Sequence, residues 1–101
     1  MILYNVTIGI DPSIEEEWLS WMTNEHIPAV MDTGLFKEYK VFKVLSVQEG
    51  DNPSYSIQYF AESIVEVNNY LQHHAPSIQQ EHMMRYKDRH VAFRTLLETV
   101  G

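Results

Sequence analysis

The chain has 101 residues, the length of a single domain spanning residues 1–101, and 45% of its residues are hydrophobic, enough to form a core. Its formal net charge of −7 disfavours contact with phosphate backbones, so we expect no nucleic-acid binding. The absence of cysteine excludes disulfides, thiolate metal ligands and cysteine nucleophiles. No apolar run approaches the roughly 18 residues of a membrane span, and the N-terminus has no signal-peptide pattern. We therefore expect a cytoplasmic protein without membrane contact.

The N-terminal segment predicts a strand followed by a helix. Residues 2–10 alternate between two faces, one of them wholly apolar, as in a strand that covers a core on one side. Ser13 and Glu16 match a capping box, which opens a helix. Trp18 and Trp21 then recur at helical spacing, so this helix is expected to place its tryptophans against the sheet.

The end of this helix carries the leading candidate for a functional residue, His26. Pro28 disfavours helical geometry at the residue before it, so the regular helix should loosen around His26 before Gly34 provides a left-handed exit. We expect His26 at the mouth of a cleft between helix and sheet, where a group that titrates near neutrality suits acid–base work. The alternative is a histidine that bonds a free carbonyl at the helix end.

The middle of the chain predicts two strands joined by a turn. Residues 36–47 carry several lysines and alternate poorly, which is typical of an edge strand. Gly50-Asp51-Asn52-Pro53 is the strongest turn signal in the chain, and it should join two antiparallel strands. Residues 55–60 alternate like the first strand and predict a third.

The last third predicts a second helical region and a fourth strand. Ser63 and Glu66 form another capping box, Pro76 interrupts the helix that follows, and a further helical piece should run from residue 77 to about residue 87. Residues 90–98 alternate again as a strand.

The order strand, helix, strand, strand, helix, strand predicts an α+β fold. Right-handed crossovers resolve it into a ferredoxin-like βαββαβ sandwich with a four-stranded antiparallel sheet and both helices on one face. The opposite face is expected to mix apolar and polar side chains, namely Leu3, Asn5, Thr7, Gln58, Phe60, Ala92, Arg94 and Leu96. A second copy is expected to cover such a face, which predicts a homodimer.

Short motifs add a family resemblance. They are Glu25 to Pro28, Thr33 to Phe36, Gln58-Tyr59, His74 to Pro76, Glu81-His82 and Val91 to Thr95. With the βαββαβ order, they resemble the dimeric α/β-barrel superfamily and in particular a short uncharacterised bacterial family common in Bacteroidetes. The resemblance covers essentially the whole chain. Related barrels include antibiotic-biosynthesis monooxygenases, heme-degrading enzymes, EthD-like proteins and stress-responsive barrels.

The resemblance also implies roles for individual residues. Several related barrels have a histidine near the end of the first helix, which His26 resembles. The heme-degrading members use an Asn on the first strand with a Trp and a His in the second helical region. Asn5 fits that pattern, whereas Tyr70 stands where the Trp is expected and His82 is only approximately placed. These departures argue against heme chemistry.

Two sets of site residues follow. The catalytic candidates, for an enzyme, are His26, Asn5 and His82, and the ligand-binding candidates are Thr7, Trp21, Gln58 and Arg94. Two alternatives remain open: Trp21 is a core residue, and the polar residues Asn5, Thr7, Gln58 and Arg94 line a hydrated dimer interface. The remaining histidines match no compact metal-ligand spacing, so no metal is expected; they are His73, His74 and His90.

The leading interpretation is a small homodimer that binds a largely apolar small molecule in the barrel cleft, with His26 and Arg94 as polar contacts and no cofactor. The rival is a monooxygenase-like enzyme that uses the same cleft, either cofactor-independent or with heme. A third possibility is a structural module for protein interaction.

Overall fold

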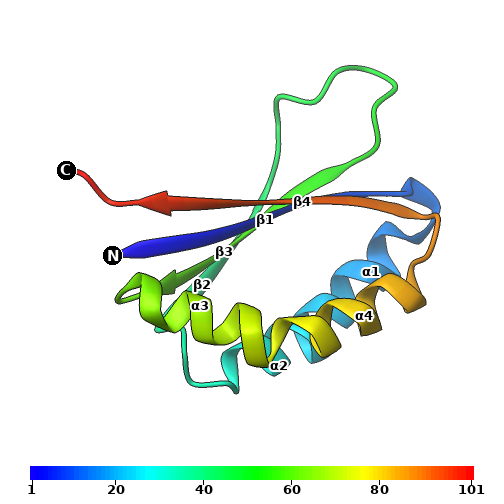
Figure 1. Cartoon of the computed structure of the whole chain (residues 1–101). Helices are drawn as coiled ribbons and strands as arrows, with labels where there is room; N and C mark the ends of the chain where they lie inside the picture. The colour runs from blue at the N-terminus through cyan, green and yellow to red at the C-terminus, as the bar shows by residue number, and fades with distance from the viewer.

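A computed structural model describes residues 1–101 and consists of one sheet with helices on one of its faces (Figure 1). The strands are β1 (Ile2–Ile10), β2 (Glu38–Lys43), β3 (Ser54–Ala61) and β4 (His90–Glu98). Their order in the sheet is β2-β3-β1-β4, and every pair is antiparallel. The predicted ferredoxin-like α+β fold is confirmed.

Two irregular helical rods form the second layer. The first contains η1 (Pro12–Ile14), α1 (Glu15–Trp21), the π-helical η2 (Met22–His26) and α2 (Ile27–Met31), and the second contains α3 (Ile64–His73) and α4 (Ala75–Arg85). The expected loosening around His26 is therefore a π-helical turn just before Pro28, which has no N–H to donate. None of the helices combines the length and apolar composition that crossing a bilayer requires.

The ends of the elements follow the sequence signals with two exceptions. Ser63 caps α3 as predicted, with its Oγ accepting from the backbone N–H of Val65. The first cap is Asp11, not Ser13, because the carboxylate of Asp11 accepts from both the N–H and the hydroxyl of Ser13. The break in the second rod lies at His74 and not at Pro76. Pro76 is in the first turn of α4, where its missing N–H removes no intrahelical hydrogen bond.

The turns behave as expected, although the second strand is shorter than predicted. Gly34 (φ 76°) and Gly50 (φ 90°) both adopt the left-handed region, which lets the chain leave the first rod and close the loop between β2 and β3. β2 spans only Glu38–Lys43, and the following residues, 44–53, form a loop that extends away from the helices (Figure 1).

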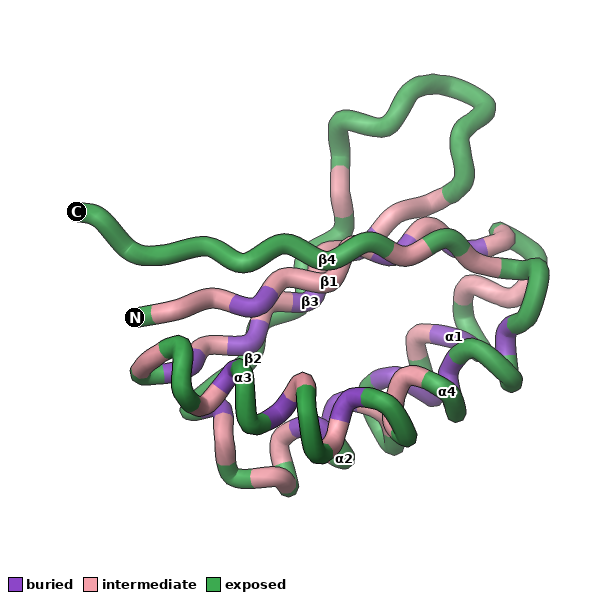
Figure 2. The backbone as a smooth tube through the Cα atoms, in the orientation of Figure 1, coloured by how far each residue is buried: buried purple, intermediate pink, exposed green.

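The core lies between the sheet and the helices. Its largest fully buried side chain is Trp18, and its strand residues come from alternate positions of β1 and β3. Each large apolar side chain buried there contributes roughly 1.5–3 kcal/mol before the entropy cost. The buried segments line the inner surfaces of both layers, whereas β4 is exposed along most of its length (Figure 2). One edge of the sheet is therefore poorly covered by helices.

The register of β4 corrects the sequence interpretation. Val6 pairs with Arg94, and Tyr4 pairs with Leu96, so Ala92, Arg94 and Leu96 lie on the helix-facing side and not on the open face as predicted. The open face instead receives Val91, Phe93, Thr95 and Leu97. The more apolar row of this strand faces away from the helices, so alternation alone predicts the wrong row as the inward one.

Candidate functional site

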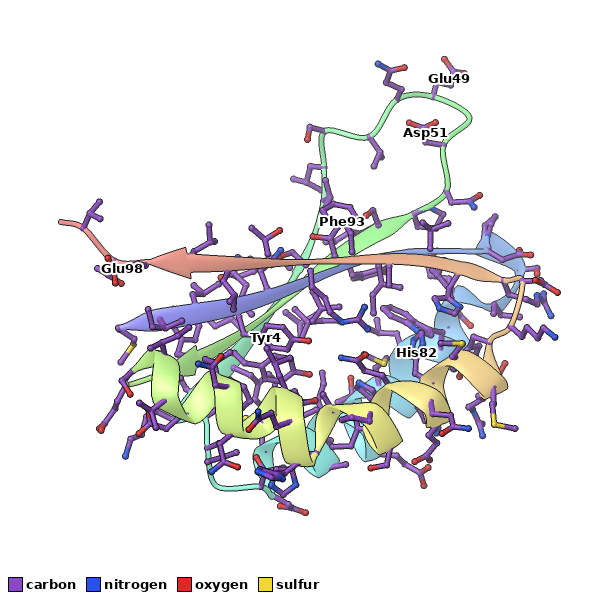
Figure 3. All side chains as sticks on the ribbon, in the orientation of Figure 1. Tyr4, Glu49, Asp51, His82, Phe93 and Glu98 are labelled. Carbon is purple, nitrogen blue, oxygen red and sulfur yellow. The ribbon has the colours of Figure 1, made fainter.

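His82 is the centre of a cluster of rings between the helices and the sheet. It projects from α4 toward the sheet, and Tyr4 projects from β1 toward the helices (Figure 3). The ring centroid of His82 lies 4.6 Å from that of His90, 5.4 Å from Tyr86 and 5.5 Å from His26. His82 is buried, with 6% of its surface exposed. The fold thus brings His26 together with His82 and His90, which are distant from it in the sequence.

A hydrogen bond from Trp18 sets the tautomer of His82. The indole Nε1–H of Trp18 lies 3.0 Å from Nε2 of His82. Because an indole nitrogen only donates, Nε2 of His82 must accept, and the proton of the neutral ring sits on Nδ1. The Nδ1–H of His82 makes no hydrogen bond within the chain. Every side-chain nitrogen that is fully buried does have a hydrogen-bond partner, so this nitrogen cannot be fully buried. Nδ1 of His82 therefore reaches solvent-accessible space as a donor.

Burial keeps these imidazoles neutral. It lowers the pKa of His82 from 6.5 to about 3, and the charges of His26, His90 and Arg94 act in the same direction. Burial also lowers the pKa of His26 from 6.5 to about 4, with a smaller contribution from Arg94. Both rings are therefore uncharged bases at neutral pH.

His26 lies at the end of the π-helical turn, where Trp21 and His82 contact its ring. The ring centroids lie 5.3 Å and 5.5 Å away, respectively. His26 is only half-buried and makes no side-chain hydrogen bond, so its ring nitrogens also reach solvent-accessible space. The expected position between helix and sheet is therefore found, and no carbonyl at the helix end accepts from the ring.

Arg94 brings a second positive charge to this cluster, in addition to Arg85, which stacks on Trp21 and Tyr86. Arg94 lies on the helix-facing side of β4, and its charge acts on the pKa of Tyr4, His26 and His82. The hydroxyl of Tyr4 also accepts from Nε2 of Gln79 on α4 at 3.4 Å. A row of polar groups thus follows the flank of the molecule between β4 and α4.

The enclosed hollow expected beside His26 is not found. The pocket of the chain is an open depression on the outer surface of α1, η2 and α4, lined by Glu17, Ser20, Trp21, Asn24, Glu25 and Arg85. On the other side of the histidine cluster, Arg94 and Leu96 are exposed on the helix-facing side of β4. Trp21 separates the two regions, since it contacts Arg85 on one side and His82 on the other.

The remaining candidates lie on the open face of the sheet, away from the histidines. Asn5 donates to the hydroxyl of Thr7 at 3.0 Å and accepts from the hydroxyl of Ser56 at 2.6 Å, and Gln58 donates to Ser56 at 3.4 Å. The predicted convergence of Asn5, Thr7 and Gln58 is therefore found. Because neighbouring residues of a strand face opposite sides, Asn5 cannot act together with His26 and His82 within one subunit.

Sequence reasoning missed four residues of the cluster: Tyr4, Trp18, Tyr86 and His90. Three of them are aromatic residues on apolar faces, where the pattern predicts only a core role. His90 begins β4, and nothing in its local sequence indicates that it contacts a histidine of α4. His73 is exposed at the end of α3, and the ring of His74 stacks on that of Tyr70 at 6.4 Å, so neither joins the cluster.

The sequence matches a known family along nearly its whole length. Residues 1–100 match the family described as a domain of unknown function, DUF4286. The chain belongs to this family. The resemblance to a short uncharacterised family is thereby confirmed, and no curated protein matches this DUF4286 chain.

Solved structures share the fold at low sequence identity. A dimeric ferredoxin-like protein from an uncultured marine organism has a TM-score of 0.78 at 8% identity, covering 99% of this chain and 95% of that one. An antibiotic biosynthesis monooxygenase has a TM-score of 0.63 at 13% identity, covering 100% of both chains. A variant of MhuD with two manganese protoporphyrin IX molecules per active site has 0.66 at 17% identity, covering 99% and 95%. The fold relationship to monooxygenase-like and heme-binding barrels is therefore established.

The residues of this chain do not fit heme in the way that the resemblance implied. The lone pair of His82 Nε2 accepts the Trp18 N–H, and the other nitrogen of that ring carries the proton. Asn5 lies on the opposite face of the sheet. An iron ligand needs a free lone pair, so His82 could bind a heme iron only after losing its bond to Trp18.

Proposed function

We propose that this protein is a homodimer that binds a small, largely apolar ligand between its helices and sheet, beside His26 and His82. The observation that carries the proposal is the pair of neutral imidazoles whose nitrogens reach solvent-accessible space within a largely aromatic cluster. A binding site of this type combines apolar walls with a few polar groups that orient the ligand.

The surroundings of the two histidines support this function. The rings of Trp21 and Tyr86 are buried beside the histidines, with 5.5 Å between their centroids, and form an apolar base for the site. Leu96, on the helix-facing side of β4, exposes 46% of its surface. A ligand that bound along β4 would cover this leucine beside the buried His82.

A ligand screen followed by thermal unfolding tests the proposal. Small aromatic acids and fatty acids that bind the folded chain should raise its melting temperature. His26→Ala should reduce that stabilisation, while His73→Ala, a matched change at an exposed histidine, should not. If no compound of a broad set stabilises the protein, ligand binding is refuted and the interaction-module alternative gains weight.

The homodimer rests on the open face of the sheet. Phe93 points away from the helices (Figure 3) and exposes 59% of its surface, and Phe42, Val91 and Leu97 expose 47%, 70% and 47%. The polar network of Asn5 lies among them. Side chains of this kind on a sheet face suit a second copy of the same face, related by a two-fold axis.

Light scattering measures the oligomeric state directly. The wild-type protein should have twice the 11.8 kDa mass of one chain. Phe93→Glu places a charge in the proposed interface and should yield monomers, whereas Met84→Glu, at a side chain that is 71% exposed on α4, should not. A wild-type protein that remains monomeric at micromolar concentration contradicts the homodimer.

The neutral imidazole of His26 favours a second candidate function, a monooxygenase-like enzyme. Because its pKa is lowered to about 4, this ring is unprotonated at neutral pH and has a free lone pair, although it is a weaker base than an exposed histidine. A cofactor-independent oxygenase of this kind would use His26 to receive the proton of a phenolic substrate. Oxygen uptake with quinol-like substrates, lost in His26→Ala, tests it, and no uptake by the wild-type protein argues against it.

A further inference from the structure

We infer that the ligand of this site carries a carboxylate, held by the guanidinium of Arg94 and the Nδ1–H of His82. This inference rests on the proposed ligand-binding function and specifies the chemical class of the ligand. It comes from the position of Arg94, from the absence of an acidic partner for it, and from the tautomer of His82.

The strand register places Arg94 between two contacts that α4 makes with the sheet. His90, on the same face of β4, lies against His82, with 4.6 Å between ring centroids. At the other end, Tyr4 pairs with Leu96 in the register and accepts from Gln79 at 3.4 Å. Gln79 and His82 are three residues apart and so share a face of α4. Arg94 therefore lies beside the stretch of α4 that carries His82.

Arg94 differs from the other arginines because it has no carboxylate. Arg85 pairs with Glu17 at 3.5 Å, and Arg89 pairs with Asp11 at 3.5 Å. Arg94 forms no ion pair, although the chain contains 14 acidic residues. An anion bound at this flank would supply the missing counter-charge. A carboxylate matches the planar fork of a guanidinium better than a single-point acceptor does.

His82 adds a second donor of fixed identity. Because Trp18 donates to Nε2, the accessible nitrogen of His82 always presents a proton and never a lone pair. A ligand group that meets it must be an acceptor, and a carboxylate oxygen meets this requirement at both His82 and Arg94. The exposed side chain of Leu96 on the same side of β4 suits an apolar body, so the class of ligand is an apolar carboxylic acid, of which an aromatic acid is the simplest rigid example.

Benzoate and benzamide form a matched pair of probes, since they share size and shape and differ in charge. Binding is measured by titration of each probe while the ring signals of His26 and His82 are followed by NMR. Benzoate should bind the wild-type protein at least about tenfold more tightly than benzamide, as expected when a charged hydrogen-bonded pair replaces a neutral one. The shifts should appear at His82, and the Nδ1–H tautomer should persist in the complex.

Substitutions then assign the preference to Arg94. Arg94→Gln should weaken benzoate binding about tenfold and leave benzamide binding unchanged, and Arg94→Lys should retain part of the preference as a point charge. Lys37→Gln removes a different cation, which pairs with Glu62 at 3.3 Å, and should change neither. Circular dichroism of each variant checks that the fold is retained.

The outcomes separate the inference from the proposed function. If benzamide binds beside the histidines as tightly as benzoate, or if Arg94→Gln leaves benzoate binding intact, the carboxylate assignment is overturned while ligand binding stands. If neither probe shifts the signals of His26 or His82, and no apolar compound does, both are overturned.

Discussion

Acid should destabilise this protein well before its carboxylates are protonated, because the fold buries two neutral histidines. The perturbation is a change from about pH 7.5 to about pH 5. In the unfolded chain both histidines take up protons near their ordinary pKa of 6.5, whereas in the folded chain the pKa of His82 is about 3 and that of His26 is about 4. The unfolded state therefore binds more protons throughout this range.

The sign and size of the effect follow from that difference. For a histidine with a lowered folded-state pKa, stability is constant above about pH 7 and falls as the pH drops below 6.5, until the folded ring itself is protonated. Each pH unit costs about 1.4 kcal/mol for each histidine, so about 2 kcal/mol for each is lost at about pH 5. Together they amount to roughly 4 kcal/mol, a large part of the 5–15 kcal/mol that stabilises a typical domain.

Urea unfolding at several pH values measures the free energy of unfolding. Trp18 and Trp21 lie beside the cluster, so their fluorescence reports on the transition. Hydrogen bonds lower the pKa of Asp11 and Glu15 below the ordinary values of 3.8 and 4.5. The stability that these carboxylates contribute is therefore lost only as the pH falls below those ordinary values. The interval between about pH 5 and about pH 7 therefore isolates the histidines.

Two variants test the assignment to the cluster. His82→Gln keeps an acceptor for the Trp18 N–H but does not titrate, so about half of the pH dependence should disappear. His73→Gln, at an exposed histidine, should leave the dependence unchanged. Equal stability of the wild-type protein at both ends of the interval, or an unchanged slope in His82→Gln, would refute the reasoning.

Three further substitutions have expected outcomes that the same urea experiment checks. Trp18→Phe should lower the free energy of unfolding by about 2–4 kcal/mol, because it leaves a cavity in the core and removes the donor to His82. The same substitution should raise the pKa of His82, measured by NMR titration. An unchanged pKa would contradict the role of this hydrogen bond. Gly34→Ala should cost about 1–2 kcal/mol through its positive φ of 76°, since no neighbouring atom lies within 4 Å of the added Cβ; no loss would mean that the backbone relaxes. Ser63→Ala should cost about 1 kcal/mol by removing the cap of α3, whereas Ser77→Ala, at a site that caps no helix, should cost less.

Much of the fold was predictable because its signals are local. The break at Pro28, the exits at Gly34 and Gly50 and the cap at Ser63 each depend on the conformational limits of one residue or on a bond to a near neighbour. The first cap was assigned to the wrong residue, because Asp11 and Ser13 are both good capping residues and compete for the same helix start.

The candidate site was predicted only in part. His26 was identified from the proline that follows it, and His82 from the resemblance, and the structure brings these two together. Asn5 was grouped with the histidines but lies across the sheet from them, and Arg94 was expected on the open face but lies on the side of the histidines. A strand shifted by one residue presents its other row of side chains.

The sequence alone determined which segments form strands and helices and in what order, because hydrophobic periodicity, caps and turn residues act within a few positions. The order of these elements then leaves few topologies, and the sheet β2-β3-β1-β4 is the one expected. Only the tertiary structure decided which row of β4 faces the helices, that Trp18 sets the tautomer of His82, and that Arg94 lacks an acidic partner. These features depend on pairings between residues far apart in the chain, such as Trp18 with His82 and Tyr4 with Leu96, and no local pattern records them.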